Sequence, residues 1–461
     1  MTSLYAGTGR SDITPPVGIA HGCWGAQTHQ RAERVDMPLT CTALVIADGE
    51  NEIAIIDIDL VWLTPAQDRL FKAELTASTG IPAGNIRISY SHTHSGSTPE
   101  FTWMSEGDEL IEPYEASLPA MITGAVAQAR GRMRPVRVGS GRGSCAMNVN
   151  RRTPTPDGSI IVGHNWDGFV DRDVLVLAID DLAGEPVATI VNYACHGTTM
   201  GPGNRALTPD FAGPTRETVE RNVGGTCLFL QGATGNLHPI VAYSDDPRDY
   251  RRNGLMLGLE AAKVRLDINS RSRNETLLRI VPSGADYAVY EESATAEPDS
   301  TLKVVNRILE LPLKDYPPVD EAQAEFDRRK AELVRVRAGG GDEKQIAEAA
   351  WPARRAELAL HHARIFGGGK AELQIQAFRL GDAALICVPL EVFAESGAAV
   401  KQRSPAPFTL FSGYSNGYYG YIPIRSAFPE GGYEVRTSPY QPDAAEKLEA
   451  ACLEVLEELW S

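Results

Sequence analysis

The sequence has few positive charges for its length, and it has no long apolar run. Its 461 residues contain 44 lysines and arginines against 60 aspartates and glutamates, a formal net charge of −16. Because a nucleic-acid-binding protein needs a basic face, this composition argues against nucleic acid as a partner. The longest apolar runs, such as Ala384–Leu390, are far shorter than the roughly 20 residues that cross a bilayer. We therefore expect no membrane partner either.

Cysteines are also few, and the first residues do not resemble a secretory signal. The seven cysteines are scattered and odd in number, and none occurs in C-x-x-C spacing. This usage is typical of buried thiols in a reducing compartment and not of a disulfide framework or a zinc ribbon. The segment MTSLYAGTGRSDITPP has neither a basic n-region nor an apolar h-region. The expected localisation is cytoplasmic.

Strand-like apolar runs alternate with helical patterns over the first 270 residues. Near-continuous apolar runs, as in strands buried on both faces, occur at 42–48, 52–63, 85–92, 173–180, 187–196 and 226–233. Apolar residues at three- and four-residue spacing predict helices at 66–79, 114–133, 213–223 and 248–266. This alternation predicts an α/β fold with a mixed sheet. We expect residues 1–461 to form a single catalytic domain.

The composition changes at 317–367, which is rich in alanine, glutamate and arginine and is broken by the glycines of 338–344. This pattern predicts an α-helical hairpin inserted into the domain, with one solvated face. The hairpin could cover a site or contact a second copy of the chain, so a homo-oligomer is one expectation. After it, 371–390 reads as a β-hairpin, and 442–460 as a terminal amphipathic helix.

Three of the strand-like runs lead into loops that contain histidine. His92 and His94 lie in SHTHSG, His196 lies in NYACHGTTMG, and His238 lies in FLQGATGNLHP. Sites in α/β folds gather at strand ends. Alternate residues of a strand share one face, so His92 and His94 could point into one cavity. Alternatively, one imidazole binds a metal and the other transfers protons. The competing interpretation is ordinary loop or core histidines.

A hydrolytic zinc site needs three or four nitrogen or oxygen ligands and one open position. Two histidines and one carboxylate would suffice. Glu391 is the candidate carboxylate, because it directly follows an apolar run in LICVPLEVF. It could equally be a first-turn glutamate that is favoured by a helix dipole.

Seven motifs occur along the chain in the order seen in neutral ceramidases: YAGTGRSDITPPVG, SHTHSG, NVNR, NYACHGTTMG, FLQGATGNLHP, VPLEVF and GYYGYIPIRSAFPEGGYE. From about residue 4 to residue 433 the chain resembles the neutral/alkaline (non-lysosomal) ceramidase-like superfamily, interrupted by the helical hairpin. The resemblance implies a ceramidase-like catalytic domain that holds Zn²⁺. Its implied metal ligands are His92, His196, Glu391 and Tyr421.

The resemblance also implies roles around the metal. His94 would be the acid/base histidine, and Arg151 and Tyr433 would contact the substrate. Tyr433 lies twelve residues after Tyr421, which is the spacing of the family's two tyrosines. Asp59 matches an acidic residue of a family strand and would orient a ligand histidine.

The chain departs from the family pattern at His238. Neutral ceramidases carry a serine there, in the form G-[DN]-x-S-P, so His238 is a further candidate catalytic residue with a different role or substrate. The family also has a signal peptide and a carboxy-terminal immunoglobulin-like domain, and we expect neither here. A true ceramidase that meets ceramide at a membrane is therefore not the expectation.

These observations predict a zinc-dependent hydrolase that cleaves a C–N bond of a small soluble amide, lactam or N-acyl compound through metal-activated water. An ester or lactone hydrolase on the same site is one alternative, and a non-catalytic binding protein is another. An amidohydrolase barrel also uses H-x-H and later histidines, but it needs a late aspartate at a strand end. We find none convincingly placed after His238.

Overall fold

The computed structural model describes residues 4–24, 26–27, 29–97, 106–268, 273–294, 299–366 and 370–461. Its largest element is an eight-stranded sheet in the order β12-β10-β9-β6-β1-β3-β4-β5. The pairs β4/β5 and β10/β12 are parallel, and the remaining neighbours are antiparallel. The strands are β1 (Leu4–Asp12), β3 (Thr40–Ala47), β4 (Glu52–Ile58), β5 (Ile86–Tyr90), β6 (Arg134–Ser144), β9 (Asp173–Asp181), β10 (Pro186–Tyr193) and β12 (Thr226–Gln231).

A second, four-stranded sheet packs face to face on the first. Its order is β16-β17-β18-β20, with β18 and β20 parallel. Apolar side chains of both sheets, such as Leu177 and Ile190 of the first and Phe378 and Leu385 of the second, form one buried cluster between them. Burial of this apolar area stabilises the pair of sheets. The strands are β16 (Leu302–Pro312), β17 (Lys370–Leu380), β18 (Ala383–Cys387) and β20 (Phe408–Ser412).

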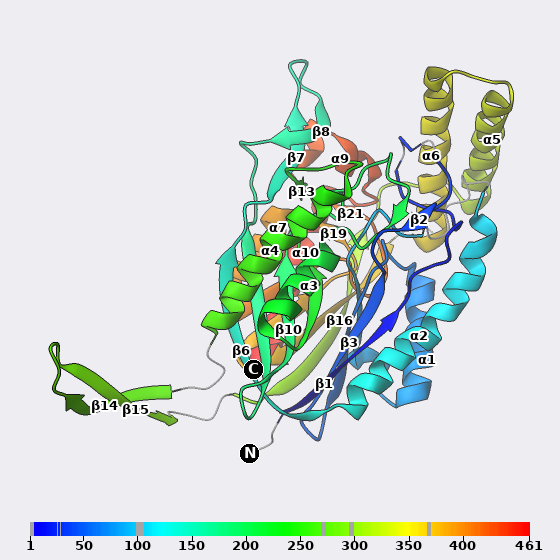
Figure 1. Cartoon of the computed structure of the whole chain (residues 1–461). Coiled ribbons are helices and arrows are strands. Elements are labelled where there is room, and N and C mark those ends of the chain that lie inside the picture. The colour runs from blue at the N-terminus through cyan, green and yellow to red at the C-terminus, as the bar shows by residue number, and fades with distance from the viewer. Residues whose placement is uncertain are drawn as a thin grey trace.

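Helices cover the two outer faces, which gives four layers (Figure 1). On the large sheet, one end is covered by α1 (Pro65–Thr79) and α2 (Ile111–Gly131), the other by α3 (Ala212–Val223) and α4 (Pro247–Asp267). The outer face of the second sheet is covered by α7 (Ala394–Arg403) and α10 (Ala444–Trp460). In the described part of the chain, we find no helix that has both the length and the apolar character needed to cross a membrane.

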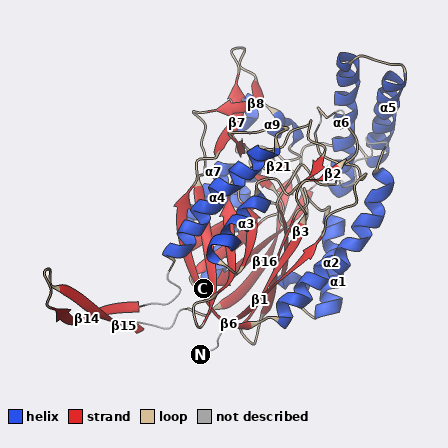
Figure 2. Cartoon of the chain, in the orientation of Figure 1, coloured by secondary structure: helices blue, strands red, loops and turns tan. Residues whose placement is uncertain are grey.

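Two hairpins and a small sheet extend beyond these layers (Figure 2). The helical hairpin consists of α5 (Val319–Ala338) and α6 (Glu343–Phe366). A β-ribbon of β14 (Arg273–Val281) and β15 (Tyr287–Ala294) projects from the opposite end of the molecule. The small sheet β13-β7-β8 contains β7 (Asn148–Pro154), β8 (Ile160–Asn165) and β13 (Leu237–Pro239).

The predicted α/β class with a mixed sheet is confirmed, and so are the four predicted helices and the helical hairpin, within a few residues. The predicted strand 52–63 is wrong beyond Ile58, where β4 ends. The predicted β-hairpin 371–390 corresponds to β17 and β18, which are the middle strands of the second sheet. The end of the predicted hairpin insertion, at residue 367, lies outside the described residues.

Candidate metal centre

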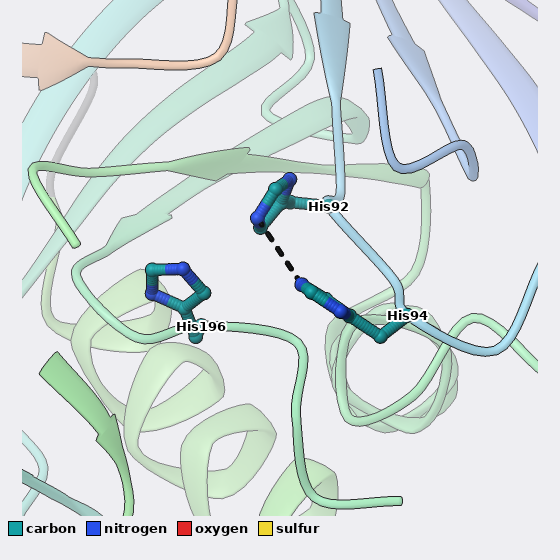
Figure 3. Close-up of side chains that lie close together, drawn as sticks. All are labelled: His92, His94 and His196. Carbon is teal, nitrogen blue, oxygen red and sulfur yellow. Dashed lines mark hydrogen bonds between the residues drawn. The ribbon is translucent and has the colours of Figure 1, made fainter. Parts of the chain in front are cut away.

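His92 and His196 meet at the edge where parallel strands end. His92 follows β5, and His196 follows β10. His92 has φ 57°, a left-handed conformation that is uncommon for a residue with a Cβ. His92 and His94 line one cavity, as expected, but strand alternation is not the cause. The chain has already left the strand, and a turn brings the imidazoles together (Figure 3).

Backbone carbonyls fix the orientation of both imidazoles. His92 Nδ1 donates to the Val61 carbonyl oxygen at 2.8 Å, and His196 Nδ1 donates to the Thr234 carbonyl oxygen at 2.7 Å. Because the proton lies on Nδ1, Nε2 carries a lone pair in the neutral ring. Burial lowers the pKa of His92 to about 4, and it also lowers the pKa of His196. Both rings are therefore neutral at pH 7, with Nε2 directed into the site.

Glu391 faces these two nitrogens. It lies on β19 (Glu391–Val392), which pairs with β21 (Tyr421–Ile422) so that Glu391 and Tyr421 are opposite each other. Glu391 Oε2 lies 3.0 Å from His196 Nε2 and 3.7 Å from His92 Nε2. Tyr421 Oη lies 3.4 Å from His196 Nε2. The four residues that the family resemblance implies as ligands therefore converge.

The hydroxyl groups of two further tyrosines hold the carboxylate. Tyr418 Oη donates to Glu391 Oε1 at 2.6 Å, and Tyr414 Oη donates to Glu391 Oε2 at 3.0 Å. Burial raises the pKa of Glu391, whereas the charge that His92 and His196 would carry when protonated and the hydrogen bond from Tyr418 lower it, to below its ordinary value. The two tyrosine hydroxyls that donate to it suit the ionised form of this carboxylate, which is only 1% exposed. The sequence analysis did not identify Tyr414 and Tyr418, because only the folded chain shows their contact with Glu391.

This arrangement fits a cation. Two imidazole lone pairs and an anionic oxygen face one another. Because both neutral rings carry their proton on Nδ1, neither ring can donate a hydrogen bond from Nε2 to the carboxylate. A buried carboxylate needs a counter-charge, but its recorded partners among the described residues are tyrosines and neutral histidines. Ligands about 2.0–2.1 Å from one zinc ion lie roughly 3.3 Å apart at tetrahedral angles. The measured separations of 3.0–3.7 Å bracket that value.

His94 lies at the open side of the cluster and is half-buried. Its Nε2 is 3.4 Å from His92 Nε2, and its Nδ1 has no hydrogen-bond partner among the residues that the structure describes. The indole of Trp24 packs on the ring with a centroid distance of 4.8 Å. One nitrogen from each of His92, His94 and His196 lies within 4.8 Å of the others, so this triad could hold a metal ion.

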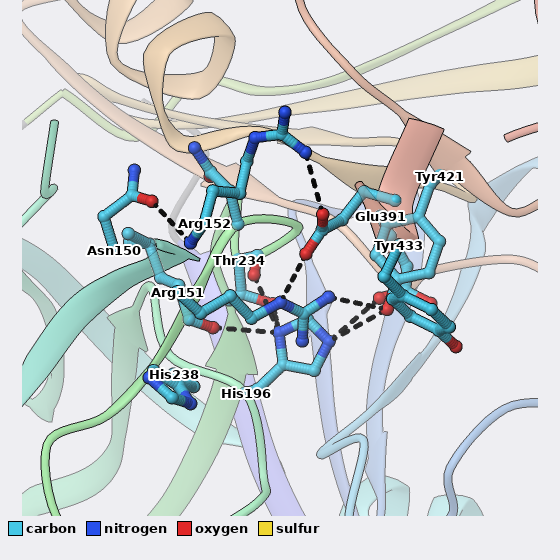
Figure 4. A network of polar contacts seen from close by, with 12 residues as sticks. Asn150, Arg151, Arg152, His196, Thr234, His238, Glu391, Tyr421 and Tyr433 are labelled. Carbon is cyan, nitrogen blue, oxygen red and sulfur yellow. Dashed lines mark hydrogen bonds and ion pairs between the residues drawn. The ribbon is translucent and has the colours of Figure 1, made fainter. Parts of the chain in front are cut away.

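Arg151 extends the site into a buried ionic network (Figure 4). Its Nη2 donates to Tyr421 Oη at 3.0 Å, and its Nε donates to Glu434 Oε1 at 2.8 Å. The second oxygen of Glu434 accepts a hydrogen bond from Arg152 at 2.9 Å. The Tyr433 ring packs on Tyr421 with centroids 5.7 Å apart. Arg151 is therefore fixed beside Tyr421, and its position depends on Glu434.

His238 lies beside this network and not within the histidine triad. It occupies the centre of β13, opposite Val149 of β7. Its Nδ1 bonds the Tyr243 hydroxyl at 2.9 Å, while its buried Nε2 has no hydrogen-bond partner in the described part of the chain. Burial and the nearby charge of Arg151 together lower the pKa of His238 to about 3. His238 is thus a neutral imidazole next to Arg151.

The prediction that Asp59 orients a ligand histidine is wrong. The Nδ1 atoms of His92 and His196 are bonded to backbone carbonyls, as described above. Asp59 Oδ2 accepts hydrogen bonds from Arg216 Nη2 at 2.5 Å and from the Thr40 backbone N–H at 2.8 Å. Asp59 therefore stabilises the chain at the end of β4. Its effect on the centre is indirect: the same segment continues to Val61, whose carbonyl oxygen holds His92.

A cavity of about 90 Å³ opens onto the centre, and the helical hairpin forms one of its walls. The centre contributes His92, His94, Glu391, Tyr421 and Tyr433 to the lining; α6 contributes Trp351, Arg354, Arg355, Glu357, Leu358, His361 and His362. A groove of about 500 Å³ lies next to it, between α1 and the hairpin. Trp62, Glu357 and His361 line both spaces. The sequence predicted the hairpin but gave no sign of which α6 residues reach the cavity.

The fold and the site define a mixed α/β protein with a histidine- and carboxylate-lined cavity at its strand ends. The profile of the neutral/alkaline non-lysosomal ceramidase family, amino-terminal part, matches residues 4–238, just over half of the chain, and the chain belongs to this family. Residues 239–461, which include Glu391 and Tyr421, lie outside that match.

Individual relatives are distant. Neutral ceramidase A of Dictyostelium discoideum is 24% identical over 241 residues, which cover 49% of this chain and 33% of the relative. The neutral ceramidase of Oryza sativa subsp. japonica is 22% identical over 259 residues, 54% of this chain and 32% of the relative. These alignments thus span about a third of the length of the curated relatives.

The structural similarity extends over the whole chain. The crystal structure of neutral ceramidase from Pseudomonas aeruginosa superposes with a TM-score of 0.71 at 19% sequence identity. The superposition covers 100% of this chain and 75% of that one. The fold of the carboxy-terminal half is therefore also that of neutral ceramidase, although the sequence profile does not reach it.

Proposed function

We propose that this protein is a zinc-dependent hydrolase that cleaves the C–N bond of a small amide, lactam or N-acyl compound. The observation that carries the proposal is that the buried carboxylate of Glu391 faces the Nε2 atoms of His92 and His196 at 3.7 Å and 3.0 Å, an arrangement that suits a bound cation. Membership of a ceramidase family supports amide hydrolysis as the reaction class.

His92, His196 and Glu391 would hold the metal, with Tyr421 as a fourth ligand. Zinc, when bound there, lowers the pKa of bound water to about 7 and polarises the scissile carbonyl. The remaining residues keep the ligands in place. The Val61 and Thr234 carbonyls hold the two imidazoles, and the tyrosine hydroxyls hold the carboxylate, as is common around metal ligands.

His94 would transfer the proton. Burial and the neighbouring histidines lower its pKa, so the ring is neutral and can accept a proton. It lines the cavity, and none of the described residues forms a hydrogen bond with its Nδ1. His94 would take the proton of the attacking water and deliver it to the leaving nitrogen.

Arg151, Tyr433 and His238 would hold the substrate. Arg151 is fixed by Glu434 and could donate to a carbonyl or carboxylate oxygen of the substrate. Tyr433 lines the cavity, and His238 would act on the other side of Arg151, at the position of the family serine. A cavity of about 90 Å³ admits little more than the reacting group, so the rest of the substrate would lie in the adjoining groove.

The groove favours a polar substrate over a long-chain lipid, because charged side chains, among them Arg69, Asp327 and Arg364, line it. The smaller cavity is mixed: Arg354 and Glu357 of α6 line it together with the apolar Trp351 and Leu358. Arg354 also donates to the Cys23 carbonyl oxygen at 3.3 Å, which ties the hairpin to the body beside the cavity. A soluble amide that carries charged or hydrogen-bonding groups is therefore the proposed substrate class.

Metal content and two matched variants test the proposal. Elemental analysis of the purified protein should find about one zinc ion per chain. His92→Ala should lose the metal and the activity, whereas His94→Ala should keep the metal and lose turnover. Loss of zinc from His94→Ala would instead make His94 a ligand. Metal-free wild-type protein without metal-dependent stability would favour a non-catalytic binding protein.

A substrate panel with and without chelator tests the reaction class. Amides, lactams and N-acyl compounds should be hydrolysed, and chelator should abolish the activity. Hydrolysis of esters or lactones alone would favour the alternative reaction on the same site. His238→Ser should change the preference among substrates, and unchanged selectivity would show that His238 only packs.

A further inference from the structure

Tyr243, His238 and Arg151 form a polar cluster beside the metal centre. His238 lies opposite Val149, and Arg151 follows Val149 by two residues on β7, so His238 and Arg151 share one face of the small sheet. Figure 4 shows these two side chains next to each other. The Tyr243 hydroxyl is 2.9 Å from His238 Nδ1, which adds a third polar group to the cluster.

The backbone of Tyr243 is held in place by the segment that follows His196. Tyr243 has φ 59°, a left-handed conformation that persists only where the surroundings impose it. Its N–H donates to the Thr198 carbonyl oxygen at 3.1 Å, and a Cβ at Gly201 would clash with the Tyr243 carbonyl group. The position of Tyr243 is thus fixed relative to His196, one of the residues that would hold the metal.

The Tyr243 hydroxyl keeps hydrogen-bonding capacity for a ligand. Burial raises its pKa, and the charge of Arg151 acts against this rise; the pKa stays above its ordinary value, so the hydroxyl is protonated at pH 7. A phenol has one donor and two lone pairs, and the bond with His238 uses one of these three positions. Tyr243 is 36% exposed, whereas Arg151 and His238 are buried. Tyr243 is therefore the most accessible member of the cluster.

The guanidinium of Arg151 has further donors as well. Toward the described residues it donates through Nε to Glu434 and through Nη2 to Tyr421, and an arginine has five N–H groups. Glu434 also pairs with Arg152, so the carboxylate that faces Arg151 is shared between two cations. A partly matched guanidinium beside a phenolic O–H of Tyr243 suits an anionic oxygen, and a carboxylate above all.

The ring of Tyr243 connects this cluster to His94. The ring meets Trp24 edge-on with a centroid distance of 5.4 Å, and Trp24 packs on His94 at 4.8 Å. His94 is the residue that would deliver a proton to the leaving nitrogen. A group bound between Arg151 and Tyr243 would therefore belong to the amine portion of the substrate, close to the bond that breaks.

We propose that the hydroxyl of Tyr243, held by His238, and the guanidinium of Arg151 bind a carboxylate on the amine portion of the substrate. An amine that carries a carboxylate close to its nitrogen is an amino acid, so the substrate class is the N-acyl amino acids. Tyr243 is then a specificity-determining residue, and His238 is a positioning residue that acts through it. The assignment of a substrate rests on the proposed hydrolase function, whereas carboxylate binding can be measured without turnover.

Binding is measured by ligand-observed NMR titration of His94→Gln, which should bind the substrate without turnover. N-acetylglycine should bind about 10-fold more tightly than its neutral primary amide, because hydrogen bonds to a charged group are the stronger ones. Adding Tyr243→Phe should weaken the binding of N-acetylglycine about 10-fold and leave that of the amide unchanged. Equal affinities of the two ligands, or an unchanged affinity in Tyr243→Phe, would overturn the proposal.

Tyr5→Phe is the matched control, because it removes the hydroxyl of a 44% exposed tyrosine on β1. It should leave both affinities unchanged. Circular dichroism melting checks that each variant is folded. His238→Ala should also weaken the binding of N-acetylglycine, but it should have no further effect once Tyr243→Phe has removed the hydroxyl. Additive losses would overturn the positioning role of His238.

Turnover by the zinc-loaded wild type separates this inference from the proposed function. Release of glycine from N-acetylglycine with a kcat/KM about 10-fold above that for the primary amide would support both. Equal hydrolysis of the two compounds would overturn the carboxylate site and leave the hydrolase standing. Selective binding of N-acetylglycine without hydrolysis of any amide would support the carboxylate site and overturn the hydrolase.

Discussion

Replacing Arg216 by methionine would remove the charge that holds two buried carboxylates together. Arg216 of α3 donates to Asp57 Oδ2 at 2.9 Å and to Asp59 Oδ2 at 2.5 Å, and all three side chains are buried. Methionine keeps much of the volume but leaves the two carboxylates without their counter-charge. Breaking a buried ion pair in this way costs about 3–5 kcal/mol. This is a large share of the roughly 5–15 kcal/mol that stabilises a typical domain.

The loss should depend on pH. Burial raises the pKa of Asp57 to about 6 even with Arg216 present, and removal of the guanidinium should raise that pKa further. An unfolded aspartate has a pKa of about 3.9. Above that pH the folded variant holds a proton that the unfolded chain has released, so its free energy of unfolding falls as the pH rises. Urea unfolding should therefore show a larger loss at pH 8 than at pH 5.

Two comparisons isolate the charge effect. Arg10→Met breaks the partly exposed Arg10–Glu220 pair and should cost only about 1 kcal/mol. Adding Asp57→Asn and Asp59→Asn to Arg216→Met should recover most of the stability, because no buried charge remains. A loss from Arg216→Met that is no larger than that from Arg10→Met, or that is the same at both pH values, would refute the reasoning.

Two further substitutions test the surroundings of the metal centre. In Gly197→Ala the new Cβ would lie 2.6 Å from the His92 carbonyl oxygen, so we expect a lower melting temperature and weaker zinc binding. Gly131→Ala is the control, because nothing lies within 4 Å of a Cβ there. Equal effects of the two substitutions would contradict the proposed clash. Tyr418→Phe removes the hydroxyl that donates to Glu391, and we expect zinc affinity to fall about 10–100-fold in a competition with a chromophoric chelator. Unchanged affinity would mean that this hydroxyl does not orient the carboxylate.

The sequence predicted the helices and strands whose apolar residues recur at regular spacing. It missed elements whose composition is set by close packing against another element. β6 has an alternation of glycine with polar residues and was not predicted. A Cβ at Gly141 would lie 2.7 Å from Ile268, and a Cβ at Gly143 would lie 2.5 Å from Val264. Glycine there allows α4 and the chain just after it to pack closely on β6. The strand's composition thus reflects a tertiary contact that a local pattern cannot reveal.

The same distinction holds at the site. Histidines at strand ends and a glutamate after an apolar run were visible in the sequence, and the structure brings them together. Tyr414, Tyr418 and the α6 side chains carry no local signal, since only the folded chain places them near Glu391 or the cavity. Asp59 shows a false positive prediction. Its place in a motif suggested that it orients a ligand histidine, but its carboxylate accepts a hydrogen bond from Arg216 instead.

The distribution of the converging residues along the chain sets a condition on how the centre is assembled. The two imidazoles come from the part that the family profile recognises, while Glu391 and Tyr421 come from β19 and β21 in the part that it does not. A fragment cut after residue 238 would contain the two imidazoles and no carboxylate to attract a cation. The proposed ion would therefore meet all of its proposed ligands only once the chain has been made as far as Tyr421, so loading should follow folding of the whole chain.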